Sequence, residues 1–132
     1  MCSRIRMTLE LWLLVYMDAF LLALGYVPSI AKCRAFGARM RNRDGLPPLT
    51  GWGAQAERAQ ANLFENLLLF AILVIAAHLS GALNGITAFG AILFAAGRTL
   101  HPAFYIAGLQ PLRITAYGVA VAGMVLLLSQ LF

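Results

Sequence analysis

Charged residues are scarce in this 132-residue chain, which has ten basic and five acidic side chains, 11% of the total. Hydrophobic residues make up 61% of the chain, and its mean hydropathy is +0.80. One soluble domain of this size could not bury so much apolar surface. The composition therefore excludes a soluble globular protein and favours a small integral membrane protein.

Cysteine is also rare, since the chain has only Cys2 and Cys33, which flank the first apolar segment. A membrane span between them would place the two thiols on opposite sides of the bilayer and prevent a disulfide. Neither cysteine lies at a spacing typical of metal ligands. We therefore expect no metal site and interpret both as incidental thiols.

Four segments of the chain are long enough to span a bilayer, because a helix crosses about 30 Å of hydrocarbon with about 20 residues. The wholly apolar part of the second segment, residues 67–77, is too short to span alone, so this helix must begin near Ala59. We predict an all-α fold, an integral membrane four-helix bundle formed by a single domain over residues 1–132. The expected spans are residues 8–30, 59–79, 81–105 and 112–132.

The basic residues indicate which loops face the cytoplasm. Five of the ten lie within residues 32–53, a stretch rich in glycine and proline that we interpret as a surface loop. Arg98 and Arg113 adjoin the third loop, so the positive-inside rule places loops one and three in the cytoplasm and both termini outside. Arg4 and Arg6 favour the opposite orientation. We predict a multi-pass protein of the cell (inner) membrane, whose net charge of +5 reflects topology rather than a nucleic-acid partner.

A competing interpretation makes the first 25 residues a signal peptide that ends in the small-residue triplet at residues 23–25. Glu10 and Asp18 interrupt its apolar core, and cleavage would leave the most basic loop outside, against the positive-inside rule. Asp18 lies near the middle of the first span, where an unpaired carboxylate costs at least about 2.5 kcal/mol. We therefore expect Asp18 to have a structural partner on a neighbouring helix, or else a role in proton or ligand handling.

Small residues recur in the third and fourth spans and predict close helix packing, which replaces the hydrophobic effect as the driving force in lipid. They are Gly81, Gly85, Gly90, Ala91 and Ala95 in the third span, and Gly118, Ala122 and Gly123 in the fourth. This pattern does not distinguish a monomer from an oligomer.

Polar side chains form a face at the start of the second span. Arg58, Asn62 and Glu65 lie at spacings of four and three, within an arc of roughly 60° on a helix. A charged face inside a membrane indicates a functional site. The alternative is an Arg58–Glu65 ion pair that reaches the membrane interface.

A second polar group surrounds the third loop. Arg98, His101 and Tyr105 share a face if the third helix continues past Arg98 with a kink at Pro102. Another pair, Arg113 and Tyr117, begins the fourth span. All these side chains are expected at the same membrane depth as the first polar face. Each also has a simpler interpretation as an interfacial histidine, an aromatic-belt tyrosine or a flanking charge.

Together these groups suit a small, multiply charged anion that also carries an amine. The three arginines can pair with carboxylates, and the one carboxylate of the polar face can accept an ammonium group. Glutathione, with two carboxylates, an amine and a thiol, meets this description, as do other metabolites.

Three motifs carry a family resemblance. Arg-Ala-x-x-Asn-x-x-Glu at residues 58–65, Gly-Arg-x-x-His-x-x-x-Tyr at 97–105 and Arg-x-x-x-Tyr at 113–117 are similar to the MAPEG family, the membrane-associated proteins in eicosanoid and glutathione metabolism. The resemblance covers nearly the whole chain. It implies a homotrimer of four-helix protomers that binds glutathione between neighbours near the cytoplasmic face.

The resemblance also implies roles for individual residues. Arg58, Asn62 and Glu65 would hold the glutathione backbone, and the same pocket would be lined by Arg98, His101, Tyr105 and Tyr117. Arg113 would lie at the thiol, where a cation favours the thiolate of a group whose free pKa is about 8.5.

Two departures from the family pattern restrict the activity. Ile114 replaces a serine and Ala61 replaces an arginine of the prostaglandin-synthase branch, so we do not expect prostaglandin isomerisation. We expect a glutathione transferase, or a peroxidase, that acts on a hydrophobic electrophile. The alternative is a non-catalytic binding or assembly protein of the bilayer with the same fold. A channel is disfavoured, because the polar groups gather at one helix end.

Overall fold

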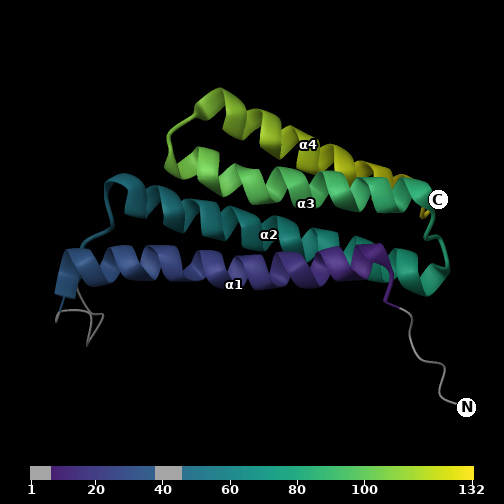
Figure 1. The fold of residues 1–132 in the computed structure, drawn as a ribbon, viewed down its shortest axis with the longest axis horizontal. Coiled ribbons are helices and arrows are strands. Elements are labelled where there is room, and N and C mark those ends of the chain that lie inside the picture. Colours follow the sequence, from purple (N-terminus) through teal and green to yellow (C-terminus); the bar gives the residue numbers. More distant parts are fainter. Residues whose placement is uncertain (1–6, 38–45) are drawn as a thin grey trace, which may run out of the picture.

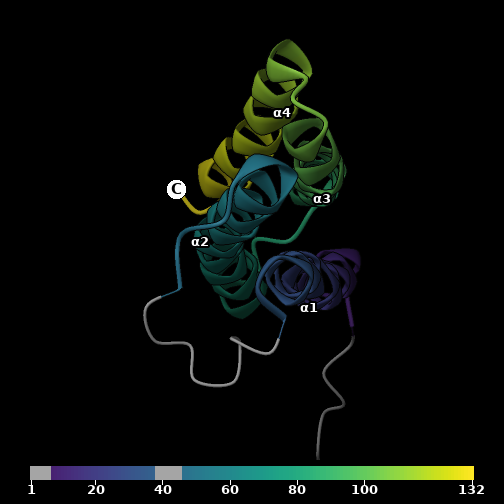
Figure 2. The same cartoon turned by 90° about the vertical axis from the view of Figure 1, so that its left-hand side faces the viewer.

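The computed structural model describes residues 7–37 and 46–132, and in these ranges the chain forms four helices and no strand. They are α1 (Leu9–Phe36), α2 (Gly51–Ser80), α3 (Gly85–Ile106) and α4 (Gln110–Ser129). The helices run up and down side by side (Figure 1), and α2 lies between α1 and the α3–α4 pair (Figure 2). The prediction of an all-α four-helix fold is confirmed.

Three of these helices, α1, α2 and α4, are long and apolar enough to cross a membrane. The remaining helix, α3, has 22 residues, but Arg98 and His101 in its last turns lower its hydropathy. It packs along α4 more extensively than any other pair of helices, and it therefore shares the depth of α4 in the bundle.

The helices extend beyond the apolar stretches at the end that carries the first loop. α1 continues to Phe36, and α2 begins at Gly51 rather than near Ala59. A helix can project from the hydrocarbon into the headgroup region because its backbone hydrogen bonds are satisfied internally. The early start places Arg58 in the third turn of α2 rather than at a frayed helix end.

Short turns connect α2 to α3 and α3 to α4. Gly81 ends α2 in the left-handed conformation, with φ at 73°, and Asn84 and Thr87 then form a capping box that begins α3. In the next turn Gly108 also has a φ of 73°, and Pro111 lies in the first turn of α4. These short connections make sequential helices antiparallel neighbours, so the start of α2, the end of α3 and the start of α4 meet at one end of the bundle.

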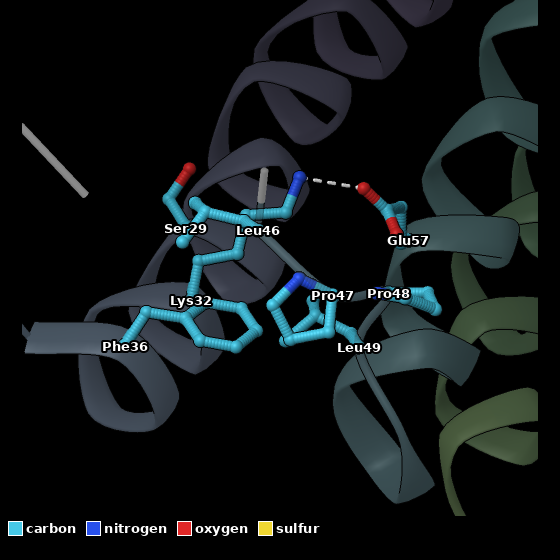
Figure 3. A pocket seen from close by; sticks show the side chains of 8 residues that line it. All are labelled: Ser29, Lys32, Phe36, Leu46, Pro47, Pro48, Leu49 and Glu57. Atoms are coloured by element: carbon cyan, nitrogen blue, oxygen red, sulfur yellow. Dashed lines mark hydrogen bonds and ion pairs between the residues drawn. The ribbon is translucent and has the colours of Figure 1, made fainter. Parts of the chain in front are cut away.

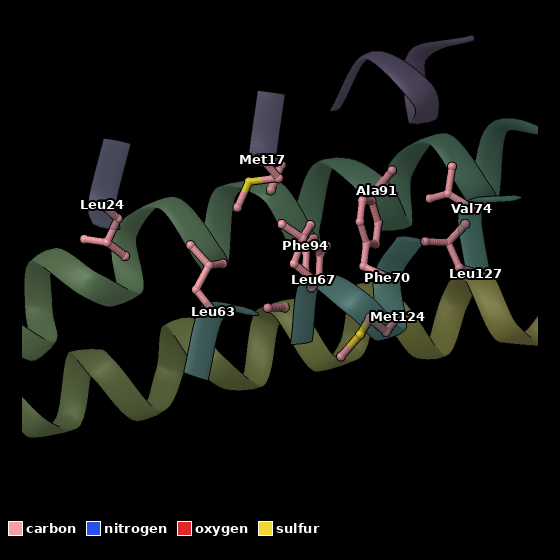
Figure 4. Packing of buried hydrophobic residues seen from close by; sticks show 12 residues of the cluster. Met17, Leu24, Leu63, Leu67, Phe70, Val74, Ala91, Phe94, Met124 and Leu127 are labelled. Atoms are coloured by element: carbon pink, nitrogen blue, oxygen red, sulfur yellow. The ribbon is translucent and has the colours of Figure 1, made fainter. Parts of the chain in front are cut away.

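The interior is built from apolar side chains of all four helices (Figure 4). Its centre is a stacked pair, Phe70 of α2 and Phe94 of α3, whose ring centroids are 4.0 Å apart. Met17 from α1 and Leu127 from α4 are also fully buried. This core leaves the opposite side of each helix exposed, which is where lipid contacts are expected in a membrane bundle.

Glycines bring α3 and α4 together. A Cβ at Gly90 would lie 2.7 Å from the carbonyl oxygen of Gly123, and a Cβ at Gly97 would lie 2.5 Å from a carbonyl oxygen of α4. The predicted packing role is confirmed for Gly90 and Gly123. It is wrong for Gly81, Gly85 and Gly118, which have open space around them, and for Ala122, which is exposed. Composition alone did not show which side of α4 faces α3.

Candidate functional site

The polar residues singled out in the sequence lie on α2, α3 and α4, at the end of the bundle where α3 turns into α4. The antiparallel order of the helices brings their polar segments to the same end (Figure 1). Two linked groups result: a buried cluster around Arg98 and a small cavity around Arg113.

Arg98 is the centre of the buried cluster, with none of its surface exposed. Its Nη1 donates a hydrogen bond of 2.8 Å to the side-chain oxygen of Asn62, which joins α3 to α2. Its guanidinium carbon lies 5.0 Å from the ring centre of Tyr117, a cation–π distance. Its Nε and Nη2 are buried and have no hydrogen-bond partner among the described residues. This cation therefore retains donors that an anion could use.

His101 connects the buried cluster to the cavity. It is 4% exposed, and its ring lies 5.6 Å from the ring of Tyr105 and 6.3 Å from the ring of Tyr117. Its Nδ1 is the third nitrogen of this cluster that is buried and has no hydrogen-bond partner in the described part of the chain. The imidazole, the two phenols and the Arg98 guanidinium thus form a continuous group.

Arg113 lies at the other end of this group, at the start of α4. Its guanidinium carbon is 4.5 Å from the ring centre of Tyr105. The two side chains and Arg58 line a cavity of about 200 Å³ between α2 and the turn from α3 to α4. Three predicted site residues from three helices therefore meet in one cavity.

The same cavity has walls that the sequence interpretation missed. Gln55, Phe104 and Gln110 line it together with the predicted residues. Gln55 precedes Arg58 by three positions, and Gln110 precedes Arg113 by three. Extension of the helical spacing by one turn toward the amino terminus would have identified both amides.

Three of the predicted site residues lie at the outer surface of the protomer: Arg58, Glu65 and Tyr117, which is 41% exposed. Arg58 and Glu65 are exposed, and the ion pair that would join them is not present among the described residues. The alternative of an Arg58–Glu65 pair along the helix is therefore not observed. Asn62, between them in sequence, turns inward to Arg98. The polar face of α2 thus divides into an inward amide and two outward charges.

The predicted partner of Asp18 on a neighbouring helix is not found among the described residues. Asp18 is exposed on α1 and makes no hydrogen bond or ion pair within residues 7–37 and 46–132. The buried carboxylate of α1 is instead Glu10, which accepts a 2.7 Å hydrogen bond from the hydroxyl of Thr87. The periodicity of α1 did not indicate which of its two acids faces inward.

A family model for the MAPEG family matches residues 9–132, nearly the whole chain. The chain belongs to the MAPEG family. This membership confirms the resemblance carried by the three motifs. No curated protein and no solved structure shows a significant match to the chain. The MAPEG family includes glutathione transferases, and its members bind glutathione.

Proposed function

We propose that this MAPEG protein binds glutathione in the group formed by Arg98, His101 and Arg113 and transfers its thiolate to apolar electrophiles. The observation that carries the proposal is the buried Arg98 guanidinium, with two nitrogens that lack a partner among the described residues. A buried cation is costly unless it is paired. A carboxylate of the ligand would supply that pair.

The chemistry of the site matches the rest of glutathione. The tripeptide has a second carboxylate, which Arg58 at the rim of the cavity can bind with its planar fork. It also has one ammonium group, for which Glu65 is an exposed carboxylate on the same helix. The amides Gln55 and Gln110 offer donors and acceptors for the peptide groups of the ligand.

Arg113 is the residue that we assign to the thiol. A free thiol with a pKa of about 8.5 is only a few per cent ionised at neutral pH, and a neighbouring guanidinium favours the thiolate. The thiolate sulfur would attack an electrophilic carbon and form a thioether as the leaving group departs with the bonding electrons. With a lipid peroxide, the thiolate would break the O–O bond, and a second glutathione would then complete the disulfide.

We also propose that the protomer assembles as a homotrimer with the site between neighbours. Ligand pockets usually measure about 300 to 1,000 Å³. The cavity of about 200 Å³ around Arg113 is smaller; Arg58, which lines it, is exposed, and so is Glu65 two turns further along α2. A second copy would complete the walls around these charges. The exposed Asp18 would likewise find its partner in a neighbouring protomer. In the membrane, loops one and three of each protomer would face the cytoplasm.

The alternative function is a non-catalytic glutathione-binding or assembly protein. The observation that favours it is that Ala61 and Ile114, which stand where the prostaglandin-synthase branch has polar residues, are both exposed and apolar. If the protein bound glutathione without ionising its thiol, it would act as a binding protein and not as a transferase.

Ultraviolet absorption of the thiolate distinguishes the two functions. Addition of glutathione to the purified protein should produce a thiolate band at neutral pH, and the Arg113→Ala variant should lose this band while it still binds glutathione. Arg34→Ala, which removes an exposed arginine remote from the site, should keep the band. Binding without a band in the parent protein would favour a non-catalytic binding protein, and absence of binding would exclude both glutathione-dependent functions and leave only the assembly role. Light scattering of the purified protein tests the trimer.

A further inference from the structure

A second cavity, of about 380 Å³, lies at the first-loop end of α1 and α2 and shares no residue with the site proposed above. Lys32 of α1 and Glu57 of α2 face each other across it (Figure 3). Its apolar walls are the side chains of Phe36, Leu46, Pro47 and Leu49. The cavity thus combines one cation, one anion and a hydrocarbon surface.

Lys32 and Glu57 form an ion pair, but this contact does not use all of their hydrogen-bond donors and acceptors. Lys32 Nζ donates a 2.6 Å hydrogen bond to Glu57 Oε1, and the two side chains are 38% and 48% exposed. An ammonium group has three N–H donors, and a carboxylate has about four acceptor sites. This contact uses one of each. Among the described residues neither group makes another hydrogen bond or ion pair, so the pair presents adjacent donors and acceptors to the cavity.

The cavity lies at the depth of the lipid headgroups. Tyr26 and Ile30 on α1 are 70% and 50% exposed, so the apolar outer surface of this helix reaches to within one turn of Lys32. With a rise of about 1.5 Å per residue, the ammonium lies just beyond the last exposed aliphatic side chain. Charged side chains at such a boundary place their heads among the phosphates of the bilayer.

We propose that this cavity binds the phosphoethanolamine headgroup of a membrane phospholipid. The headgroup carries a phosphate and a primary ammonium close together. These two charges are complementary to the adjacent ammonium of Lys32 and carboxylate of Glu57. The phosphate accepts hydrogen bonds from Lys32, and the ligand ammonium donates to Glu57. Phe36 and Leu49 contact the glycerol and the first carbons of an acyl chain.

This arrangement discriminates between headgroups. Phosphocholine has a quaternary nitrogen without N–H donors, so it cannot hydrogen-bond to Glu57. Phosphoglycerol has no cation, and its phosphate would lie beside the Glu57 carboxylate with no compensating charge. A partly exposed pair contributes modestly, so we expect phosphatidylethanolamine to bind about fivefold more tightly than either competitor.

Native mass spectrometry of the full-length protein in detergent tests this selectivity. The protein is titrated with phosphatidylethanolamine, phosphatidylcholine and phosphatidylglycerol of identical acyl chains. The Lys32→Gln/Glu57→Gln double variant keeps the side-chain volumes and can keep a hydrogen bond between them, so it should fold but lose the preference. Glu57→Gln alone should bind the three lipids nearly equally. Arg34→Gln, which removes an exposed charge two residues away, should retain the preference of the parent protein.

Equal binding of the three lipids by the parent protein would overturn the proposal. A preference for phosphatidylethanolamine that survives in the double variant would also overturn it, because the selectivity would then arise elsewhere. Soluble glycerophosphoethanolamine is the control for the source of the headgroup. If it competes as strongly as the lipid, the ligand is a soluble phosphoethanolamine and the lipid assignment is wrong.

Discussion

Replacement of Arg98 with methionine should change stability and ligand affinity in opposite directions. Arg98 is fully buried, and its hydrogen bond to Asn62 at 2.8 Å leaves two of its nitrogens without a partner in the described chain. Replacement of a buried ion pair by apolar side chains of similar volume is often neutral or stabilises a protein by about 1 to 4 kcal/mol, and a buried guanidinium without an anionic partner has an uncompensated desolvation cost that an apolar side chain removes. The lost bond to Asn62 subtracts about 1 kcal/mol. The ligand-free variant should therefore unfold at a higher temperature than the parent.

The affinity for glutathione should fall in the same variant. Two hydrogen bonds from a charged donor to a ligand carboxylate contribute about 3 kcal/mol at the lower end of their range. Because about 1.4 kcal/mol is a factor of ten, the dissociation constant should rise about 100-fold. The Arg98→Lys variant keeps the charge without the planar fork, and its affinity should lie between those of the parent and Arg98→Met.

Calorimetric titration with glutathione and thermal unfolding with and without ligand measure the two effects on one preparation. Arg34→Met is the matched control, since it removes an exposed arginine and should alter neither quantity by much. An Arg98→Met protein that binds glutathione as tightly as the parent would refute the assignment of Arg98 to the ligand carboxylate. A variant that is less stable than the parent without ligand would show that the guanidinium is structurally compensated and that its two nitrogens are not reserved for a ligand.

Two further predictions concern the packing that supports the site. Gly97→Ala should destabilise the protein by about 1 to 3 kcal/mol in thermal unfolding, because its Cβ would lie 2.5 Å from a carbonyl oxygen of α4. The control is Gly118→Ala, which has open space around it and should be neutral or slightly stabilising. Equal effects of the two substitutions on stability would contradict the close approach of α3 and α4. Thr87→Val should destabilise the protein by about 1 to 3 kcal/mol, because the buried hydroxyl donates to Glu10 and accepts from the backbone N–H of Asn84. The control is Thr115→Val, which should have little effect because this hydroxyl is exposed and bonds only within its own helix. A Thr87→Val protein as stable as the parent would show that the hydrogen bonds of Thr87 contribute nothing to stability.

The sequence was sufficient to predict the membrane class, the four helices and the family, for identifiable physical reasons. Apolar runs of spanning length have few alternatives to a helix, because each backbone polar group in lipid must be satisfied within its own segment. Spacings of three and four along α2 and α3 indicate which side chains share a face regardless of what the face contacts. The convergence of Arg58, Tyr105 and Arg113 on one cavity follows from this spacing and from the antiparallel order of the helices.

Periodicity did not predict contacts between helices. Asn62 and Glu65 occupy the same predicted face, yet Asn62 turns inward to Arg98 and Glu65 remains exposed. Glu10 and Asp18 are both acids of α1, and only Glu10 is buried. The rotation of a helix about its axis depends on the shapes of its neighbours, and small differences in rotation exchange a buried residue for an exposed one.

The family, the all-α fold and the polar ends of the helices were thus available from the order of the residues, because they depend on local spacing and on hydropathy. Only the packed helices show three further features: the side of α4 that contacts α3 at Gly97, the amides that complete the cavity, and the contact of Lys32 with Glu57 beside the first loop. These contacts join residues far apart in the chain, and their geometry is set by the closest approach of whole helices rather than by any single segment.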